Sequence, residues 1–140
     1  MSTPIAPDDI VQTPAEGEAN SRPPLLVVEP LRAFLDEHGL GAGELVATPI
    51  GEGHSNVTYL IERGGSEFVL RRPPRPPLPP SAHDVLREAR LLRALRGTPA
   101  RVPEVLAVCD TMARLDQRLG RVEAYVTSRE FDLQRKFREL

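Results

Sequence analysis

The residues best suited to chemistry lie in the stretch GEGHSNVTYLIERGGSEFVLRRPP, which runs from Gly51 to Pro74. Glycines open the stretch, and paired arginines, Arg71 and Arg72, stand near its end. Glycines let a backbone approach a ligand closely, and backbone amides and arginines are good hydrogen-bond donors to phosphate groups. The stretch therefore indicates a site that holds the phosphates of a nucleotide.

Glu88 is a carboxylate whose position calls for a cationic partner. On a helical wheel it falls between Leu92 and Leu95, within the apolar arc of the helix predicted over 81–96. A carboxylate that faces a core is unfavourable unless it is paired, so Glu88 needs Arg71 or Arg72. Strand alternation lets only one of these arginines face the helix, and the spacing alone does not choose between them.

The elements that must position these residues predict an α+β fold. The hydrophobic pattern predicts, in chain order, a helix over 29–40, strands over 44–50, 55–62 and 67–72, a helix over 81–96 and a strand over 104–109. Gly64 and Gly65 form a two-residue hairpin turn, because glycine tolerates the positive φ that such turns require. The expected architecture is an antiparallel sheet with one packed helix.

The two ends of the chain have a different character. Residues 1–28 are predicted to be a disordered tail, since their first part is rich in proline and acidic residues and lacks hydrophobic periodicity. After Asp110, apolar residues recur at spacings of three and four, and the segment TSRE at 127–130 resembles a capping box. We therefore expect 111–140 to be a helical tail that adds no strand to the sheet.

Composition narrows the class of protein. The 140 residues carry a formal net charge of −2, which points neither to nucleic acid nor to a membrane surface. Cys109 is the single cysteine, and the N-terminus lacks the basic start and apolar run of a secretory signal. We expect a cytoplasmic protein with no nucleic-acid partner and no membrane span.

Three motifs in order, GEGHSNVTYLI, FVLRRPP and LREARLLRAL, resemble the aminoglycoside phosphotransferase family within the protein-kinase-like fold. The resemblance covers about residues 30–109 and implies a kinase-like N-terminal lobe over 29–110. It implies ATP as the cofactor and assigns nucleotide binding to a set of six residues: Gly51, Gly53, Ser55, Asn56, Arg71 and Glu88. Arg71 would contact phosphate, and Glu88 would orient it through an ion pair.

The resemblance also implies a second lobe, in which a His-Gly-Asp motif followed five residues later by an asparagine would carry catalysis and bind magnesium. These 140 residues contain no such motif, and no magnesium site can be assigned. We therefore expect an N-terminal lobe from a truncated or rearranged gene, inactive alone and binding nucleotide weakly at best. Its full-length relatives would transfer the γ-phosphate of ATP to a hydroxyl of a small molecule.

Other interpretations of the same residues stay open. The glycine loop, residues 51–56, can be a plain strand connection, and the pair that Glu88 forms with an arginine can be purely stabilising. The chain can also be a non-enzymatic interaction module that binds a partner, or a second copy of itself, through helices over 112–139.

Overall fold

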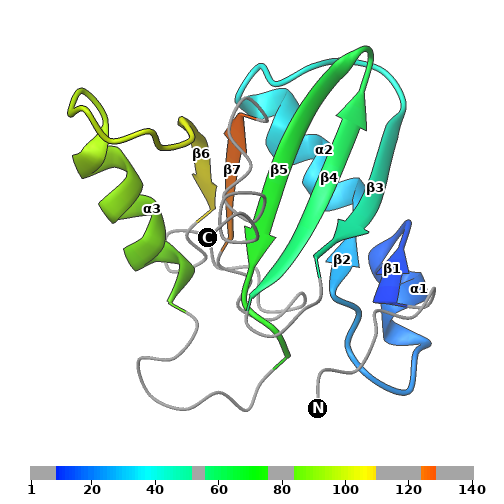
Figure 1. Ribbon diagram of the computed structural model, residues 1–140. Coiled ribbons are helices and arrows are strands. Elements are labelled where there is room, and N and C mark those ends of the chain that lie inside the picture. Colours follow the sequence, from blue (N-terminus) through cyan, green and yellow to red (C-terminus); the bar gives the residue numbers. More distant parts are fainter. Residues whose placement is uncertain (1–8, 52–55, 76–83, 110–123, 129–140) are drawn as a thin grey trace.

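The computed structural model describes residues 9–51, 56–75, 84–109 and 124–128, and these form an α+β fold around one five-stranded antiparallel sheet (Figure 1). The strand order is β3-β4-β5-β7-β6. The strands are β3 (Leu45–Ile50), β4 (Val57–Arg63), β5 (Ser66–Arg72), β6 (Val105–Cys109) and β7 (Ala124–Ser128). The longer helices are α2 (Val28–Glu37) and α3 (Val85–Leu95), and the N-terminal part adds β1 (Ile10–Val11), α1 (Pro14–Glu18) and β2 (Leu26–Val27).

The predicted hairpin is confirmed. β4 and β5 pair antiparallel with Arg63 opposite Ser66, and the turn residues Gly64 and Gly65 have φ of 54° and 82°. A Cβ atom on Gly64 would also lie 2.0 Å from the carbonyl oxygen of Ala42. Glycine is therefore required there both by the backbone conformation and by the space available.

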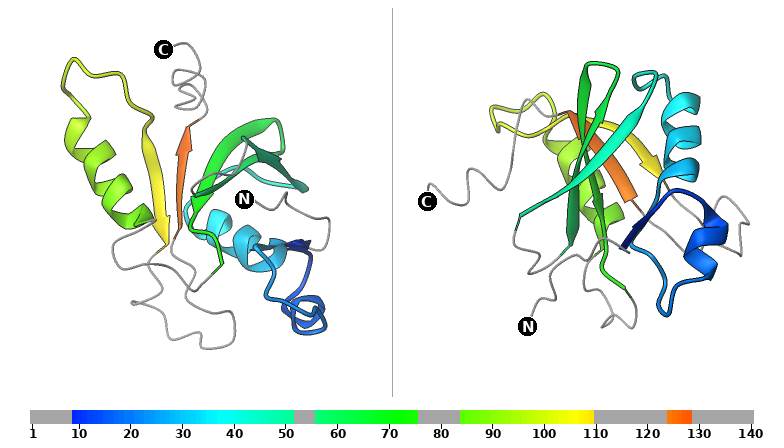
Figure 2. Two further views of the ribbon diagram at one scale, coloured as in Figure 1. Left: turned by 60° about the horizontal axis from the view of Figure 1, so that its bottom comes forward. Right: turned by 90° about the vertical axis from the view of Figure 1, so that its right-hand side faces the viewer.

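The two longer helices lie on opposite faces of the sheet (Figure 2). Leu31 and Leu35 of α2 share a buried cluster with Val126 of β7. On β7, Tyr125 is the residue next to Val126, and it packs against α3. Successive side chains of a strand point to opposite faces, so these two clusters are separated by the sheet itself. The helix predicted over 81–96 thus packs on β6 and β7, with Asp84 as its N-cap and Gly97, at a φ of 83°, just after its end.

The prediction of a helical tail is wrong for residues 124–128. They form β7, which lies between β5 and β6 and pairs antiparallel with both. The segment AYVTS is rich in β-branched and aromatic residues, and pairing on both sides outweighs its accidental fit to a heptad spacing. The remaining parts of the predicted tail, 111–123 and 129–140, lie outside the described residues.

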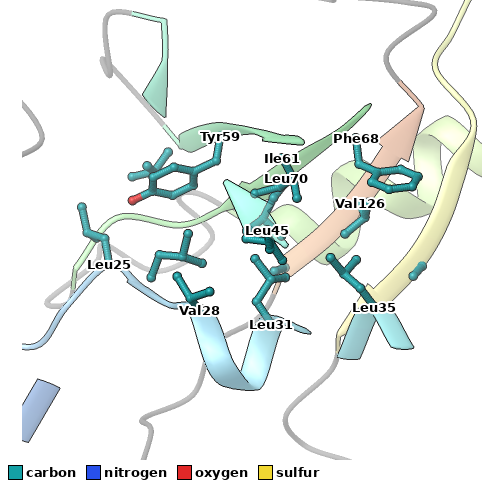
Figure 3. Packing of buried hydrophobic residues seen from close by; sticks show 14 residues of the cluster. Leu25, Val28, Leu31, Leu35, Leu45, Tyr59, Ile61, Phe68, Leu70 and Val126 are labelled. Carbon is teal, nitrogen blue, oxygen red and sulfur yellow. The ribbon is translucent and has the colours of Figure 1, made fainter. Parts of the chain in front are cut away.

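The prediction of a disordered N-terminal tail over 1–28 is wrong for residues 9–28; residues 1–8 lie outside the described ranges. β1 pairs with β2 in parallel, and the side chain of Thr13 caps α1. Leu25 and Val28 enter the core with α2, against Tyr59, Ile61 and Leu70 of the hairpin (Figure 3). Burial of apolar side chains from this segment explains why it is ordered despite its weak periodicity.

Candidate functional site

Arg71 and Glu88 form the ion pair that the sequence predicts. The Nε of Arg71 donates to Oε2 of Glu88 at 2.7 Å, and its Nη2 donates to Oε1 at 3.4 Å. The two side chains face each other in a bidentate arrangement, which fixes the plane of the guanidinium as well as its position. Arg71 is the last residue but one of the hairpin strand β5, and Glu88 lies in the first turn of α3.

The register of β5 decides which arginine meets Glu88. Phe68, Leu70 and Arg72 are buried on the face that α2 covers, and Arg71 lies on the other face. Arg72 donates from Nε to its neighbour Pro73 O at 3.0 Å and from Nη1 to Leu25 O. Arg72 therefore anchors the N-terminal segment, and of these two arginines it is Arg71 that faces Glu88.

Two further side chains donate hydrogen bonds to the carboxylate of Glu88. Asn56 Nδ2 donates to Oε1 at 3.0 Å, and the hydroxyl of Tyr125 donates to Oε2 at 2.9 Å. Arg71 is held on its other side, since its Nη1 donates to Thr58 Oγ1 at 3.1 Å. The site is thus a polar network built from β4, β5, α3, β7 and the residue that precedes β4.

The network leaves Arg71 with unused donor capacity toward the described residues. A guanidinium has five N–H groups, and the three hydrogen bonds of Arg71 to Glu88 and Thr58 use three of them. Its side chain is 21% exposed and that of Glu88 is 36% exposed, so the pair lies at the surface of the sheet rather than within the core. An anion that reaches this surface meets a fixed, permanently charged donor.

The glycine loop is placed only at its two ends. Gly51 follows β3 with a φ of 86° and is exposed, while Gly53 and Ser55 fall outside the described residues. Asn56 closes the loop and is 4% exposed, with its amide directed to Glu88. The structure thus brings Asn56, Arg71 and Glu88 together, and it sets Gly51 at the opposite end of the same loop.

Sequence reasoning missed two residues of the described network, Thr58 on β4 and, with more consequence for the site, Tyr125 on β7. The segment of Tyr125 was expected to be helical, although the run of Tyr, Val and Thr at 125–127 is a signal for a strand. Burial, and next the negative charge of Glu88, raise the pKa of the Tyr125 hydroxyl far above its usual value. The hydroxyl therefore stays protonated at neutral pH and acts as a donor.

A metal site does not emerge from the described part of the chain, where no three His, Cys, Asp or Glu side chains gather closely enough to hold an ion. Within the same residues, no helix has the length and apolar character needed to cross a membrane. The described donor that is best suited to an anion is the guanidinium of Arg71.

Comparison with known proteins decides the family. The profile described as "Phosphotransferase enzyme family" matches residues 46–130, which span the sheet, α3 and the whole polar network. The chain belongs to this phosphotransferase family. Enzymes of the family use ATP, and their fold is kinase-like, in agreement with the resemblance that the sequence motifs carry.

The curated relatives of this phosphotransferase chain are much longer proteins that are named after acyl-CoA dehydrogenases. It is 39% identical over 72 residues to "Acyl-CoA dehydrogenase family member 11" of Gallus gallus, which covers 51% of this chain and 9% of that protein. It is 39% identical over 80 residues to "Acyl-CoA dehydrogenase family member 10" of Mus musculus, covering 57% and 7%. It is 45% identical over 64 residues to "Probable acyl-CoA dehydrogenase IBR3" of Arabidopsis thaliana, covering 42% and 8%. The chain thus spans less than a tenth of the length of these relatives, and no solved structure matches it significantly.

Proposed function

We propose that this chain is the nucleotide-binding part of a phosphotransferase and that Arg71 binds the phosphates of ATP. The observation that carries the proposal is the fixed guanidinium of Arg71, which Glu88 and Thr58 hold from two sides. Such preorganisation lowers the entropic penalty of binding a charged ligand, because the donor is already in place before the ligand arrives.

The neighbourhood of Arg71 supports the same assignment. Thr58 is paired directly with Arg71 across the hairpin, and the glycine loop ends at Asn56, two positions before Thr58 along the chain. The loop that begins at Gly51 therefore returns to the sheet beside the guanidinium. Glycine-rich backbone and a fixed cation together form a cradle for phosphate, and we assign Gly53 and Ser55 of the loop to it as well.

Arginine in this position differs from the lysine that protein kinases place there. Arginine stays charged at every physiological pH and presents a planar fork, whereas lysine presents a single point charge. The bidentate contact with Glu88 uses one edge of the fork, and its remaining N–H groups are suited to phosphate oxygens. ATP, when bound, would supply the phosphoryl group that the family transfers.

Catalysis is a separate matter from binding. The 140 residues hold no His-Gly-Asp motif followed by asparagine, so we propose that they bind ATP weakly and transfer no phosphate by themselves. The names of the relatives suggest a hydroxylated acyl thioester as the acceptor of the complete enzyme. Cys109 is the single cysteine of these 140 residues, which fits a reducing compartment, and we place the chain in the cytoplasm.

A titration of the purified chain with ATP, followed by calorimetry, tests the proposal. We expect binding in the wild type, a loss of at least about tenfold in Arg71→Ala, and partial retention in Arg71→Lys, because lysine keeps the charge but loses the fork. Arg90→Ala is the matched control, since Arg90 is exposed on α3 and its replacement changes the net charge equally. Equal losses in Arg71→Ala and Arg90→Ala would refute a specific role for Arg71.

A further inference from the structure

Glu88 is a partly exposed side chain that must adopt one orientation to direct Arg71. Its side chain is 36% exposed, and the buried contacts of α3 are made by Val85, Ala89 and Leu92 rather than by Glu88. Helix packing alone therefore places the backbone of α3 but leaves the carboxylate free to rotate. Something else must fix its two oxygens, because a carboxylate in another rotamer would release the guanidinium.

The two oxygens of Glu88 are each shared between Arg71 and a second donor. Oε2 accepts from Arg71 Nε at 2.7 Å and from the Tyr125 hydroxyl at 2.9 Å, and Oε1 accepts from Arg71 Nη2 at 3.4 Å and from Asn56 Nδ2 at 3.0 Å. Tyr125 is the direct cross-strand partner of Arg71 in the β5–β7 register. The tyrosine and the arginine therefore reach the same oxygen from adjacent strands.

We infer that Tyr125 and Asn56 are positioning residues, which hold the Glu88 carboxylate, and through it Arg71, in the orientation that binds phosphate. The inference rests on the proposed function of Arg71. Tyr125 is 2% exposed and Asn56 is 4% exposed, so neither hydrogen bond is diluted by competing water. Asn56 directly precedes β4, and its amide therefore also joins the start of that strand to α3 through the same carboxylate.

The other tyrosine of the chain provides a matched control. Tyr59 is as buried as Tyr125, at 0% exposed, but within the described residues its hydroxyl has no hydrogen-bond partner. Tyr125→Phe and Tyr59→Phe therefore remove the same atom from equally buried rings. Only the first substitution removes a donor to Glu88, so a difference between the two variants isolates the hydrogen bond from the packing of the ring.

Two readouts on the full chain test the inference. In Tyr125→Phe we expect the affinity for ATP to fall about tenfold, because the fraction of chains with Arg71 in the binding orientation would fall to about a tenth. In Tyr59→Phe we expect no change in affinity. The second readout needs no nucleotide: hydrogen exchange of the Arg71 Nε–H, followed by NMR and assigned with Arg71→Lys. This proton should exchange faster in Tyr125→Phe and at the wild-type rate in Tyr59→Phe.

The outcomes separate this inference from the proposed function. If the wild type binds no ATP, the proposed function fails, and the exchange of the Arg71 Nε–H still decides whether Tyr125 positions Glu88. If both readouts are unchanged in Tyr125→Phe, Tyr125 serves only to fill space between β7 and α3, and the inference is refuted. Should Tyr125→Phe not fold, Asn56→Ala removes the donor to the other oxygen and carries the same two measurements with the same expected losses.

Discussion

Glu88 receives hydrogen bonds from side chains that reach it from three different strands or strand ends, and its stability contribution follows from that arrangement. Replacement by alanine would leave the buried hydroxyl of Tyr125 without its acceptor, while Arg71 could still turn toward water. We expect Glu88→Ala to lower the free energy of unfolding by about 1–2 kcal/mol, less than for a fully buried pair because the side chain is 36% exposed.

Urea unfolding measures this difference. Glu44→Ala is a suitable control, since Glu44 is an exposed glutamate outside the network and its replacement should change stability by less than about 0.5 kcal/mol. A loss in Glu88→Ala no greater than in the control would show that the network contributes nothing to folding.

The burial of Tyr59 should make the free energy of unfolding fall at alkaline pH. Burial raises the pKa of its hydroxyl from 10.0 to about 12, so in this range the unfolded chain ionises first and gains stability relative to the folded chain. The stability that the folded chain has while the Tyr59 hydroxyl is protonated in both states is fully present below pH 10 and is lost as the pH rises toward 12. We expect the stability of Tyr59→Phe relative to the wild type to improve by roughly 2–3 kcal/mol between pH 9 and pH 12. Chemical unfolding at a series of pH values would reveal it, and a constant difference would mean that Tyr59 titrates normally in the folded protein.

At the scale of elements, the N-terminal segment is held by arginines from the far end of the hairpin. Arg72 donates to Leu25 O, and Arg75 donates to Pro23 O at 2.6 Å and also pairs with Asp9. Asp9 is 1% exposed and is paired with Arg22 as well. These contacts join residues far apart in sequence, which is why local periodicity did not indicate an ordered segment.

Arg72→Ala tests this anchor. Arg72 is 7% exposed, so its loss removes packing and leaves the Leu25 carbonyl without its donor. We expect a decrease of about 2–4 kcal/mol in the free energy of unfolding. Faster proteolysis at residues 9–27 should accompany it, whereas the exposed control Arg90→Ala should behave as the wild type. A stable Arg72→Ala chain with an equally protected N-terminal segment would show that apolar burial alone holds the segment.

β7 is the element that the sequence pattern concealed. The hairpin could be predicted because Gly64, Gly65 and the alternation of β4 and β5 are local signals. The wheel position of Glu88 predicted an arginine partner, and the family resemblance pointed to Arg71 rather than Arg72. β7 owes its conformation to pairing with β5, more than fifty positions earlier, and with β6. The local spacing of apolar residues does not indicate such non-local pairing, and for the same reason the sequence did not indicate Tyr125 as a site residue.

Amide hydrogen exchange distinguishes a central strand from a peripheral helix at 124–128. We expect the amides of Tyr125, Val126 and Thr127 to belong to the slowest class, with those of Tyr59 and Leu70, because they lie between two paired strands or in the core. Exchange as fast as in the five-residue helix α1 would contradict the placement of β7 in the sheet.

For the molecule as a whole, β7 changes the prediction of self-association. The apolar spacing after Asp110 predicted that Val126 lies on a helical stripe, yet Val126 is 0% exposed in the core of the sheet. The other residues of that stripe lie outside the described ranges, so association through them stays a prediction. What the described residues form is a sheet that is covered on one face by α2 and the N-terminal segment and carries the polar network, beside α3, on the other.

The central claim is that this network binds the phosphates of ATP through Arg71, and the ratio of the affinities for ATP and adenosine tests it most directly. Two charge-assisted hydrogen bonds from the guanidinium to phosphate should make ATP bind about 10- to 100-fold more tightly than adenosine in the wild type. In Arg71→Ala the ratio should fall close to one, while the affinity for adenosine stays unchanged. A wild-type ratio near one, or a ratio that survives in Arg71→Ala, would contradict the account.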